Sequence, residues 1–307
     1  MQFLYWLESI RHPFLDAVMS IITMAGEETV FLGVALLIFW CLDKKRGYLF
    51  LLIGFVGITI NQILKLTFRI PRPWVKDPSF TVVDSAVEAA TGYSFPSGHT
   101  QNAVDTFGCI GYATKRRWLR ITLALLILLV AFSRMYLGVH TPLDVGVSLL
   151  IGALLIFVLY PICDRLFRNE EVLRFALALA VLMSACFVLY TELFPFPANI
   201  DAHNLAEGQK NAYTLLGCSL GLFVSCLVDN KWLNFKTNAP FLGQLVKLVV
   251  GAGIALAIKA LLKAPLLSLF GGHALATALR YFIVVIFAGV LWPLTFPLWA
   301  KLGKRKG

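Results

Sequence analysis

Apolar segments of helical length alternate with short polar stretches along the whole chain. Several of these segments approach or reach the roughly 17 to 25 residues that an α-helix needs to cross a bilayer. The pattern predicts nine membrane spans, at about 28–42, 48–68, 97–114, 121–137, 141–163, 173–190, 211–229, 244–262 and 274–300. Residues 1–27 mix apolar and charged positions and predict an interfacial segment with an amphipathic helix. The expected fold class is therefore all-α, a polytopic membrane helical bundle.

The composition supports a membrane protein. Hydrophobic residues make up 59% of the 307 residues and charged residues 14%, whereas about a quarter of the residues in a soluble domain are charged. The first twenty residues have no basic start and contain Glu8, Arg11 and Asp16, so they do not resemble a secretory signal. The six cysteines form no C-x-x-C pair. We interpret them as small apolar side chains rather than as disulfide partners or metal ligands.

The basic residues predict an orientation in the membrane. A formal charge of +10 is compatible with nucleic-acid binding, but the basic residues are spread over short loops between the predicted spans, so we expect no nucleic-acid partner. Sixteen of the 27 fall in alternate loops: Lys44, Lys45, Arg46, Lys115, Arg116, Arg117, Arg120, Arg165, Arg168, Arg174, Lys231, Lys236, Lys301, Lys304, Arg305 and Lys306. Cytoplasmic loops are enriched in Lys and Arg. We therefore expect a cytoplasmic C-terminus, with the loop 69–95 extracytoplasmic or lumenal.

A short stretch at the end of that loop carries candidate chemistry. Ser97 suits the N-cap position of a helix, and Gly98 and His99 follow it directly. The free backbone N–H groups of a first helical turn bind anions. Such a capping turn is common by itself, so its meaning depends on the residues that converge on it.

Two further polar clusters fall on the same expected side of the membrane. A charged side chain at the centre of a bilayer costs about 2.5 to 3.5 kcal/mol on insertion scales, so charged residues in or beside spans are expected to face a polar cavity. Three cations, two helix starts and two imidazoles together suit a phosphate group. The residues of these two clusters are Lys65, Arg72, Arg134, His140 and Asp144.

Each cluster also has a structural interpretation. Residues 141–144 fit an ordinary helix start, with Thr141 as N-cap and proline in the first turn. Arg72 fits an interfacial anchor, and the long side chain of Lys65 can reach the headgroups. The presence of all three clusters on one expected membrane face favours the functional interpretation.

The order and spacing of these residues resemble a known signature. Lys65 precedes Arg72-Pro73, then follow Pro96-Ser97-Gly98-His99 and finally Ser133-Arg134, His140 and Asp144. This pattern resembles, at every motif position, the three-part signature of the type 2 phosphatidic acid phosphatase superfamily. That superfamily includes lipid phosphate phosphatases, polyprenyl pyrophosphate phosphatases, sphingosine phosphate phosphatases, glucose-6-phosphatase and vanadium haloperoxidases. The resemblance covers about residues 28–163. A fainter likeness to the sphingosine phosphate phosphatase and glucose-6-phosphatase branch rests on residues 26–28, Trp40, Asp43 and 69–73.

The resemblance implies a role for each motif residue. His140 would attack phosphorus and form a phosphohistidine, Asp144 would fix its tautomer, and His99 would protonate the leaving oxygen and later activate water. The implied phosphate-binding residues are Lys65, Arg72, Ser97, Gly98 and Arg134. The implied mechanism needs no metal and no other cofactor. Because one imidazole must be neutral and the other protonated, we expect a bell-shaped pH profile.

We expect three parts along the chain. An interfacial segment (1–27) precedes a phosphatase catalytic core (28–163) and a C-terminal bundle of about four extra spans (164–307), which carries no recognisable catalytic motif. Two interpretations remain open for three basic residues near the expected outer ends of the last spans. They either snorkel to the interface or form a second basic patch that holds a lipid headgroup. These residues are Lys259, Lys263 and Arg280.

The predicted function is that of an integral membrane phosphatase, which hydrolyses a lipid phosphate monoester or a lipid pyrophosphate from the outer leaflet. The expected partners are this substrate and the membrane lipids, and the sequence leaves a homodimer open. The expected location is the plasma membrane of a bacterium or an endomembrane of a eukaryote. One alternative is a phosphatase of a soluble sugar phosphate, and another is a non-catalytic lipid transporter on the same fold. Pure binding would need the cations but not a histidine backed by a carboxylate.

Overall fold

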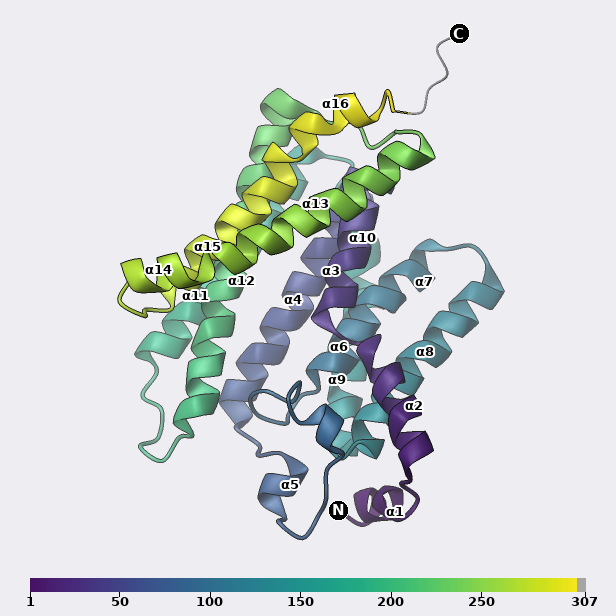
Figure 1. Cartoon of the computed structure of the whole chain (residues 1–307), viewed down its shortest axis with the longest axis vertical. Coiled ribbons are helices and arrows are strands. Elements are labelled where there is room, and N and C mark those ends of the chain that lie inside the picture. Colours follow the sequence, from purple (N-terminus) through teal and green to yellow (C-terminus); the bar gives the residue numbers. More distant parts are fainter. Residues whose placement is uncertain (303–307) are drawn as a thin grey trace. The chain divides into compact units, whose positions relative to one another are not determined.

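The computed structural model describes residues 1–302, which are mostly helical (Figure 1). No β-strand occurs among these residues. The predicted all-α class is therefore confirmed. The expectation of a cytoplasmic C-terminus rests partly on Lys304, Arg305 and Lys306, which lie outside the described residues.

Most helices follow one another with short connections, but the segment 77–97 between α5 and α6 is long and contains only a short 3₁₀ turn, η2 (Asp84–Ala86). The first half of the chain contains α1 (Gln2–Ser9), α2 (Pro13–Met24), α3 (Glu28–Leu37), α4 (Lys44–Phe68), α5 (Pro73–Lys76), α6 (Gly98–Ala103), α7 (Cys109–Ala113), α8 (Arg117–Tyr136) and α9 (Pro142–Leu154). The second half contains α10 (Tyr160–Leu166), α11 (Glu170–Leu193), α12 (Ala202–Val228), α13 (Phe241–Leu261), α14 (Lys263–Leu269), α15 (Leu275–Ile286) and α16 (Phe296–Trp299). Five-residue π-helical turns follow several of them: η1 (Ile38–Leu42), η3 (Val104–Gly108), η4 (Leu155–Leu159), η5 (Asp229–Leu233) and η6 (Phe287–Leu291).

The number of membrane spans is smaller than predicted. Among the described residues, seven helices are long and apolar enough to cross a membrane, or eight if α2 and α3–η1, which meet at a 41° bend, count as one span. The continuous helix 98–113 has only 16 residues. At 1.5 Å per residue it is about 24 Å long, which is less than the roughly 30 Å of a bilayer core. The structure therefore shows slightly fewer candidate spans than the nine predicted.

The described chain packs into two compact units that are not contiguous in sequence. Unit 1 contains Met1–Leu32, Val56–Ile162 and Phe196–Gly208, and unit 2 contains Gly33–Phe55, Cys163–Pro195 and the described chain from Gln209 on. The boundaries expected after residues 27 and 163 stay a prediction. All six cysteines are free.

In unit 1, α6 packs against α8 and α9, and α2 packs along α8. Gly26, just after α2, allows a close approach to α6. A Cβ atom at Gly26 would lie 2.6 Å from the backbone O of His99 and 2.8 Å from Cγ1 of Val130. Such distances leave room only for glycine. This contact fixes the backbone position of His99.

Helix α1 covers the turn that leads from α8 to His140. Leu4 and Leu7 are buried in an apolar cluster that also contains the end of α8 and the residues after it. Arg11 Nε donates to the backbone O of Tyr136 at 2.8 Å. The N-terminal segment therefore holds the turn in front of His140.

Unit 2 has its own polar cluster, which surrounds the buried Asp229. Lys44 Nζ lies 2.8 Å from Asp229 Oδ2 and 3.2 Å from Asn234 Oδ1. The other carboxylate oxygen, Asp229 Oδ1, accepts a hydrogen bond from the backbone N of Phe235 at 3.0 Å. Helices α12 and α15 approach closely in the same unit, because a Cβ atom at Gly217 would lie 2.1 Å from the backbone O of Ala278.

Candidate active site

The starts of α6 and α9 are joined to each other by hydrogen bonds. Ser97 caps α6, since its Oγ accepts from the backbone N of Thr100 at 3.4 Å and from Thr100 Oγ1 at 2.9 Å. The backbone N of Ser97 donates to the backbone O of Asp144 at 3.1 Å, and Ser148 Oγ donates to the backbone O of Ser97 at 2.9 Å. Two helix N-termini, which both favour negative charge, are thus brought to one place.

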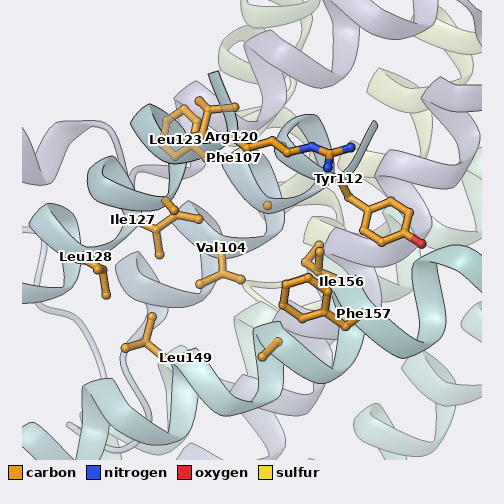
Figure 2. A pocket seen from close by; sticks show the side chains of 14 residues that line it. Val104, Phe107, Tyr112, Arg120, Leu123, Ile127, Leu128, Leu149, Ile156 and Phe157 are labelled. Carbon is orange, nitrogen blue, oxygen red and sulfur yellow. The ribbon is translucent and has the colours of Figure 1, made fainter. Parts of the chain in front are cut away.

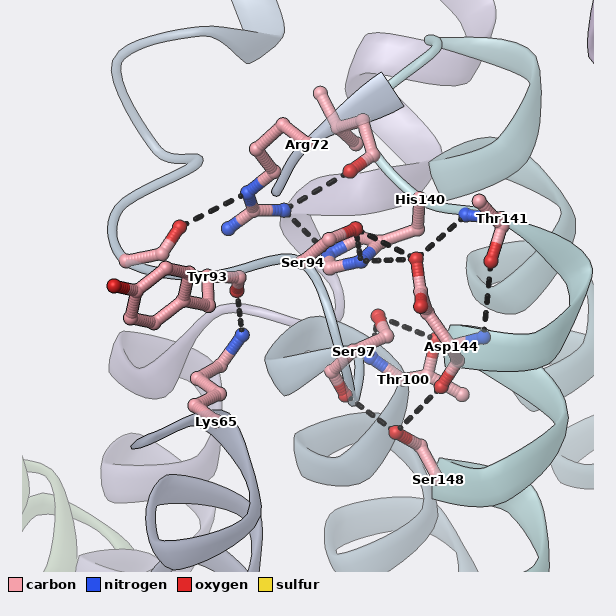
Figure 3. Close-up of polar contacts among 12 residues, drawn as sticks. Lys65, Arg72, Tyr93, Ser94, Ser97, Thr100, His140, Thr141, Asp144 and Ser148 are labelled. Atoms are coloured by element: carbon pink, nitrogen blue, oxygen red, sulfur yellow. Dashed lines mark hydrogen bonds and ion pairs between the residues drawn. The ribbon is translucent and has the colours of Figure 1, made fainter. Parts of the chain in front are cut away.

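Asp144 is held from several sides (Figure 3). Its Oδ2 accepts from the backbone N of Thr141 at 2.7 Å and from Ser94 Oγ at 2.6 Å. The Thr141 hydroxyl in turn accepts from the backbone N of Asp144, which completes a capping box. His140 Nδ1 lies 3.5 Å from the same carboxylate oxygen. The carboxylate therefore faces the Nδ1 side of the imidazole.

Arg72 contacts the opposite nitrogen of the same imidazole. Its Nη1 lies 2.9 Å from His140 Nε2 and 3.0 Å from the backbone O of Val139. Its Nε and Nη2 donate to the backbone O atoms of Gly92 and Thr91 at 3.2 and 2.8 Å. An arginine can only donate, so Nε2 must accept with its lone pair. Nδ1 then carries the proton of the neutral imidazole, on the side of Asp144.

The two remaining cations differ in how they are satisfied. Lys65 Nζ donates a short hydrogen bond to the backbone O of Tyr93. Arg134 Nη1 donates to Thr23 Oγ1 at 2.7 Å, while its buried Nε and Nη2 have no hydrogen-bond partner. Among the described residues, none of the three site cations forms an ion pair with an acid. The cluster thus has positive charge and free donors for an anion.

His99 and Gly98 complete the cluster. The Nε2 atom of His99 is buried and has no hydrogen-bond partner. A Cβ atom added at Gly98 would meet no atom within 4 Å, so there is open space beside the start of α6. The first turn of α6 therefore has room for a ligand.

The surroundings set the charge state of His140. Burial and, after it, the charges of Arg72, Arg134 and Lys65 hold the pKa of its imidazole well below the ordinary value of 6.5. The neutral form, with its Nε2 lone pair directed at Arg72, is therefore present at neutral pH and in mildly acidic solution.

The structure gathers the motif residues of the core in one cluster. A hydrogen bond links Arg72 to His140, the Asp144 carboxylate lies 3.5 Å from the His140 ring, and the backbone of Asp144 accepts from Ser97. The charges of Lys65 and Arg134 act on both His99 and His140. The other basic residues of interest belong to unit 2. There Lys259 and Arg280 lie 5.4 and 5.1 Å from the ring centroid of Tyr281, and Lys263 begins α14.

Sequence reasoning missed two of the contacts that orient this cluster. Ser94 donates to Asp144, and its place just before the capping turn was a usable signal. Thr23 accepts from Arg134 although 111 residues separate the two. Nothing in the local sequence around Thr23 indicates this contact.

A large cavity in unit 1 is lined mainly by apolar side chains (Figure 2). It has a volume of about 700 Å³ and lies between η3–α7, α8 and α9–η4, with Val104, Leu128 and Leu149 among its lining residues. Val104 follows His99 by five residues, so the cavity begins about 8 Å further along the helix axis. Its lining suits a hydrocarbon chain but not a phosphate group.

Metal ligands are not grouped in the part of the chain that the structure describes. No set of three or more His, Cys, Asp or Glu side chains among residues 1–302 could hold a metal ion. The donors around His140 are mainly cationic, so they suit an anion better than a cation.

The fold and the site together define a class of protein, namely a helical membrane protein whose site holds two histidines among three cations. The chain belongs to the PAP2 superfamily, whose model matches residues 45–168. A second model, described as the transmembrane extension of PAP2 superfamily phosphatases, matches residues 213–305. The likeness therefore reaches beyond the core, into spans for which the sequence motifs gave no family.

Several curated relatives are phosphatases. Undecaprenyl-diphosphatase BcrC of Bacillus subtilis is 30% identical over 162 residues, which are 52% of this chain and 80% of the relative. Phosphatidylglycerophosphatase B of the same organism is 30% identical over 175 residues, 53% of this chain and 82% of the relative. A probable sphingosine-1-phosphate phosphatase of Dictyostelium discoideum is 26% identical over 255 residues, 78% of this chain and 58% of the relative. The last match confirms the expected likeness to that branch. No solved structure matches the chain significantly.

Proposed function

We propose that the protein is an integral membrane phosphatase that hydrolyses a lipid phosphate monoester or a lipid pyrophosphate through a phosphohistidine intermediate. The observation that carries this proposal is that Arg72 and Asp144 face opposite sides of the His140 imidazole. Arg72 donates to Nε2 and the carboxylate faces Nδ1. This arrangement leaves a neutral imidazole whose lone pair points into a cluster of cations, as a nucleophile for a phosphorus atom requires.

The first step transfers the phosphoryl group to His140. A bound phosphate takes over the donors of Arg72 and the free Nε and Nη2 of Arg134, which releases the Nε2 lone pair. Nε2 attacks phosphorus and the P–O bond to the lipid alcohol breaks. His99 gives its proton to the leaving oxygen, while Asp144 stabilises the Nδ1–H of the modified ring.

The second step releases phosphate. The now neutral His99 takes a proton from a water molecule, whose oxygen attacks phosphorus and breaks the P–N bond to His140. Burial and, after it, the surrounding cations disfavour a proton on His99 in the empty site. A phosphate dianion between them offsets this effect, so substrate binding and protonation of His99 support each other.

Two finer features belong to the proposal. The cations and helix N-termini supply the charge stabilisation that a metal ion provides in other phosphatases, so we propose a metal-independent reaction. We also propose that the site opens to the extracytoplasmic or lumenal side, because the basic residues gather in the loops expected on the other side. This orientation requires the helix 98–113 and the bent pair α2 and α3–η1 to cross the membrane despite their length.

Phosphate release in detergent from a panel of lipid phosphates tests the proposal. We expect release by the wild type and a loss of at least about 10⁴-fold in kcat/KM for His140→Ala, because the nucleophile is removed. Absence of release from every lipid would favour a transporter. Release from a sugar phosphate alone would favour a soluble substrate, and activity that survives in the variant would exclude His140 as nucleophile.

The pH dependence offers a second test. His140 acts as the neutral base form, and its pKa lies below 6.5, so the acidic limb of kcat/KM should lie below pH 6.5. The basic limb belongs to kcat, because His99 holds its proton only beside the bound phosphate and loses it as the pH rises, which gives a bell-shaped profile for the bound enzyme. A rate that rises continuously from pH 5 to 9 contradicts the assignment.

A further inference from the structure

The cavity of about 700 Å³ in unit 1 has one polar and one apolar end (Figure 2). The guanidinium of Arg120 and the hydroxyl of Tyr112 lie on one side of it, and Leu128 and Leu149 lie on the other. Its volume falls within the roughly 300 to 1,000 Å³ of sites that bind small molecules. The apolar walls suit a hydrocarbon chain, so an anionic group fits only at the end where Arg120 lies. The two ends together suit an amphiphile.

The polar end of the cavity is far from the phosphate cluster. Arg120 and Arg134 lie on the same helix, α8, and are separated by almost four turns. At 1.5 Å per residue this separation is about 21 Å along the helix axis. Arg134 belongs to the cluster around His140. A lipid whose phosphate lies on Arg120 is therefore not in position for attack by His140.

Arg120 is held in a way that leaves most of its donors for a ligand. Its Nε donates to the backbone O of Thr114 at 2.8 Å, and its side chain is exposed. A guanidinium has five N–H donors, so both terminal nitrogens remain for an anion after this bond. Among the described residues, no acid forms an ion pair with Arg120. The bond to Thr114 fixes the guanidinium at the end of α7.

The surroundings of this end are strongly basic. Residues 115–117, just before Arg120, are all Lys or Arg and all exposed, and no Asp or Glu occurs between Asp105 and Asp144. Cytoplasmic loops are commonly basic, which explains the charge of the loop but not the presence of an arginine in the wall of an apolar cavity. Basic residues next to a membrane attract anionic lipids. Charge complementarity therefore favours an anionic headgroup over a zwitterionic one.

We propose that this cavity binds an acyl chain of an anionic phospholipid from the leaflet next to the α7–α8 loop, with the phosphate of the lipid on Arg120. The chain lies along Leu123 and Ile127, between α8 and α9–η4. The headgroup charge selects the lipid. This lipid is bound and not hydrolysed, so the inference does not depend on the proposed phosphatase function.

Photo-crosslinking tests the proposal with the full chain in nanodiscs of phosphatidylcholine. Two trace probes carry the same diazirine-labelled acyl chain, one on phosphatidylglycerol and one on phosphatidylcholine, and the labelled peptides are identified by mass spectrometry. A basic residue near the membrane surface favours an anionic lipid by about 1 kcal/mol, which is about fivefold. We expect the phosphatidylglycerol probe to label the residues that line the cavity at least about fivefold more than the phosphatidylcholine probe does.

Two variants separate the headgroup from the chain. Arg120→Gln removes the charge, so labelling of the cavity by the phosphatidylglycerol probe should fall to the level of the other probe. Gly111→Leu fills the cavity. A Cβ atom at Gly111 would meet no atom within 4 Å except Leu123 Cδ1 at 3.9 Å, so the new side chain has room. This variant should abolish labelling of the cavity by both probes.

Each variant has a matched control. Arg168→Gln removes an exposed basic residue that does not line the cavity. Gly253→Leu adds a side chain on the exposed side of α13, where a Cβ atom would meet no atom within 4 Å. Both controls should keep the wild-type labelling of the cavity.

The comparison of the two probes in the wild type decides the proposal if a variant fails to fold. Equal labelling by both probes means lipid contact without a site and overturns the proposal, as does a preference that survives in Arg120→Gln. Labelling that persists in Gly111→Leu shows that the chain lies elsewhere. A loss of kcat/KM in Gly111→Leu that grows with the chain length of an alkyl phosphate assigns the cavity to the substrate and also overturns the proposal.

Discussion

The two units treat their buried charges differently. In unit 1, Arg134 is 1% exposed, donates one hydrogen bond to Thr23 and leaves Nε and Nη2 without a partner. In unit 2, Asp229 is 0% exposed, but Lys44 and the backbone N of Phe235 engage both of its oxygens. Arg134 therefore keeps two donors free for a ligand, whereas both carboxylate oxygens of Asp229 already have protein partners.

The difference separates a binding role from a structural role. A buried donor without a partner costs about 1 to 3 kcal/mol, so unit 1 keeps Arg134 at the expense of stability. A phosphate that accepts from Nε and Nη2 removes this cost only in the bound state. The Lys44–Asp229 pair, in contrast, satisfies its charges in the folded protein without a ligand. Substitutions should therefore affect activity in one unit and stability in the other.

Within this comparison of the two units, the largest expected effect is on Arg134. Arg134→Met removes the charge and both free donors while keeping a long side chain, and we expect kcat/KM to fall by about 10³-fold. The melting temperature in detergent should not fall, because two unpaired donors disappear with one hydrogen bond. Arg117→Met, at the exposed first residue of the same helix, is the control and should stay within about twofold of the wild-type kcat/KM. A large loss of stability for Arg134→Met would remove the distinction between the units.

Asp229→Asn should instead lower the stability of the protein and leave its activity nearly unchanged. Breaking a buried pair leaves Lys44 without its counter-charge, and we expect a loss of about 2 to 4 kcal/mol in the free energy of unfolding, measured by denaturant titration in detergent. The kcat/KM of the folded fraction should stay within about twofold. Asp43→Asn serves as the control, because its ion pair with Arg46 is exposed and long at 3.8 Å. An activity loss that exceeds the loss of folded protein would give Asp229 a catalytic role.

The smallest expected effect concerns the basic residues of unit 2. Arg280 is largely buried and its Nε has no partner, as in Arg134, and it shares the ring of Tyr281 with Lys259. We propose, on this likeness, that the patch binds a lipid headgroup. The double variant Lys259→Gln, Arg280→Gln should raise KM for the lipid substrate by about threefold at unchanged kcat. Unchanged activity together with unchanged substrate preference would leave only the snorkelling interpretation.

Local sequence predicted the elements whose geometry depends on neighbouring residues. Ser97 caps α6, and the capping box of Thr141 and Asp144 follows from their spacing. The family signature added the motif residues that the structure gathers around His140. Helix caps and motifs, which depend on a few residues close together in the sequence, could therefore be predicted from the sequence.

Contacts between distant segments and the number of spans were not predictable in this way. Thr23 lies in a mostly apolar helix, and its position in the sequence does not indicate that Arg134 is its partner. The predicted span count is slightly high because apolar composition does not fix where a helix ends, and the helix 98–113 has only 16 residues. The contact of Thr23 depends on tertiary packing, which no local pattern encodes.

Trapping of the intermediate tests the central claim most directly. Purified protein is mixed with a phosphatase substrate that has a good leaving group and a labelled phosphorus, and is quenched within milliseconds under basic conditions. We predict an acid-labile, base-stable label on His140 that accumulates further in His99→Ala, because that variant lacks the base for the second step. A label at another residue, an undiminished label in His140→Ala, or turnover without any protein-bound label would contradict the phosphohistidine mechanism.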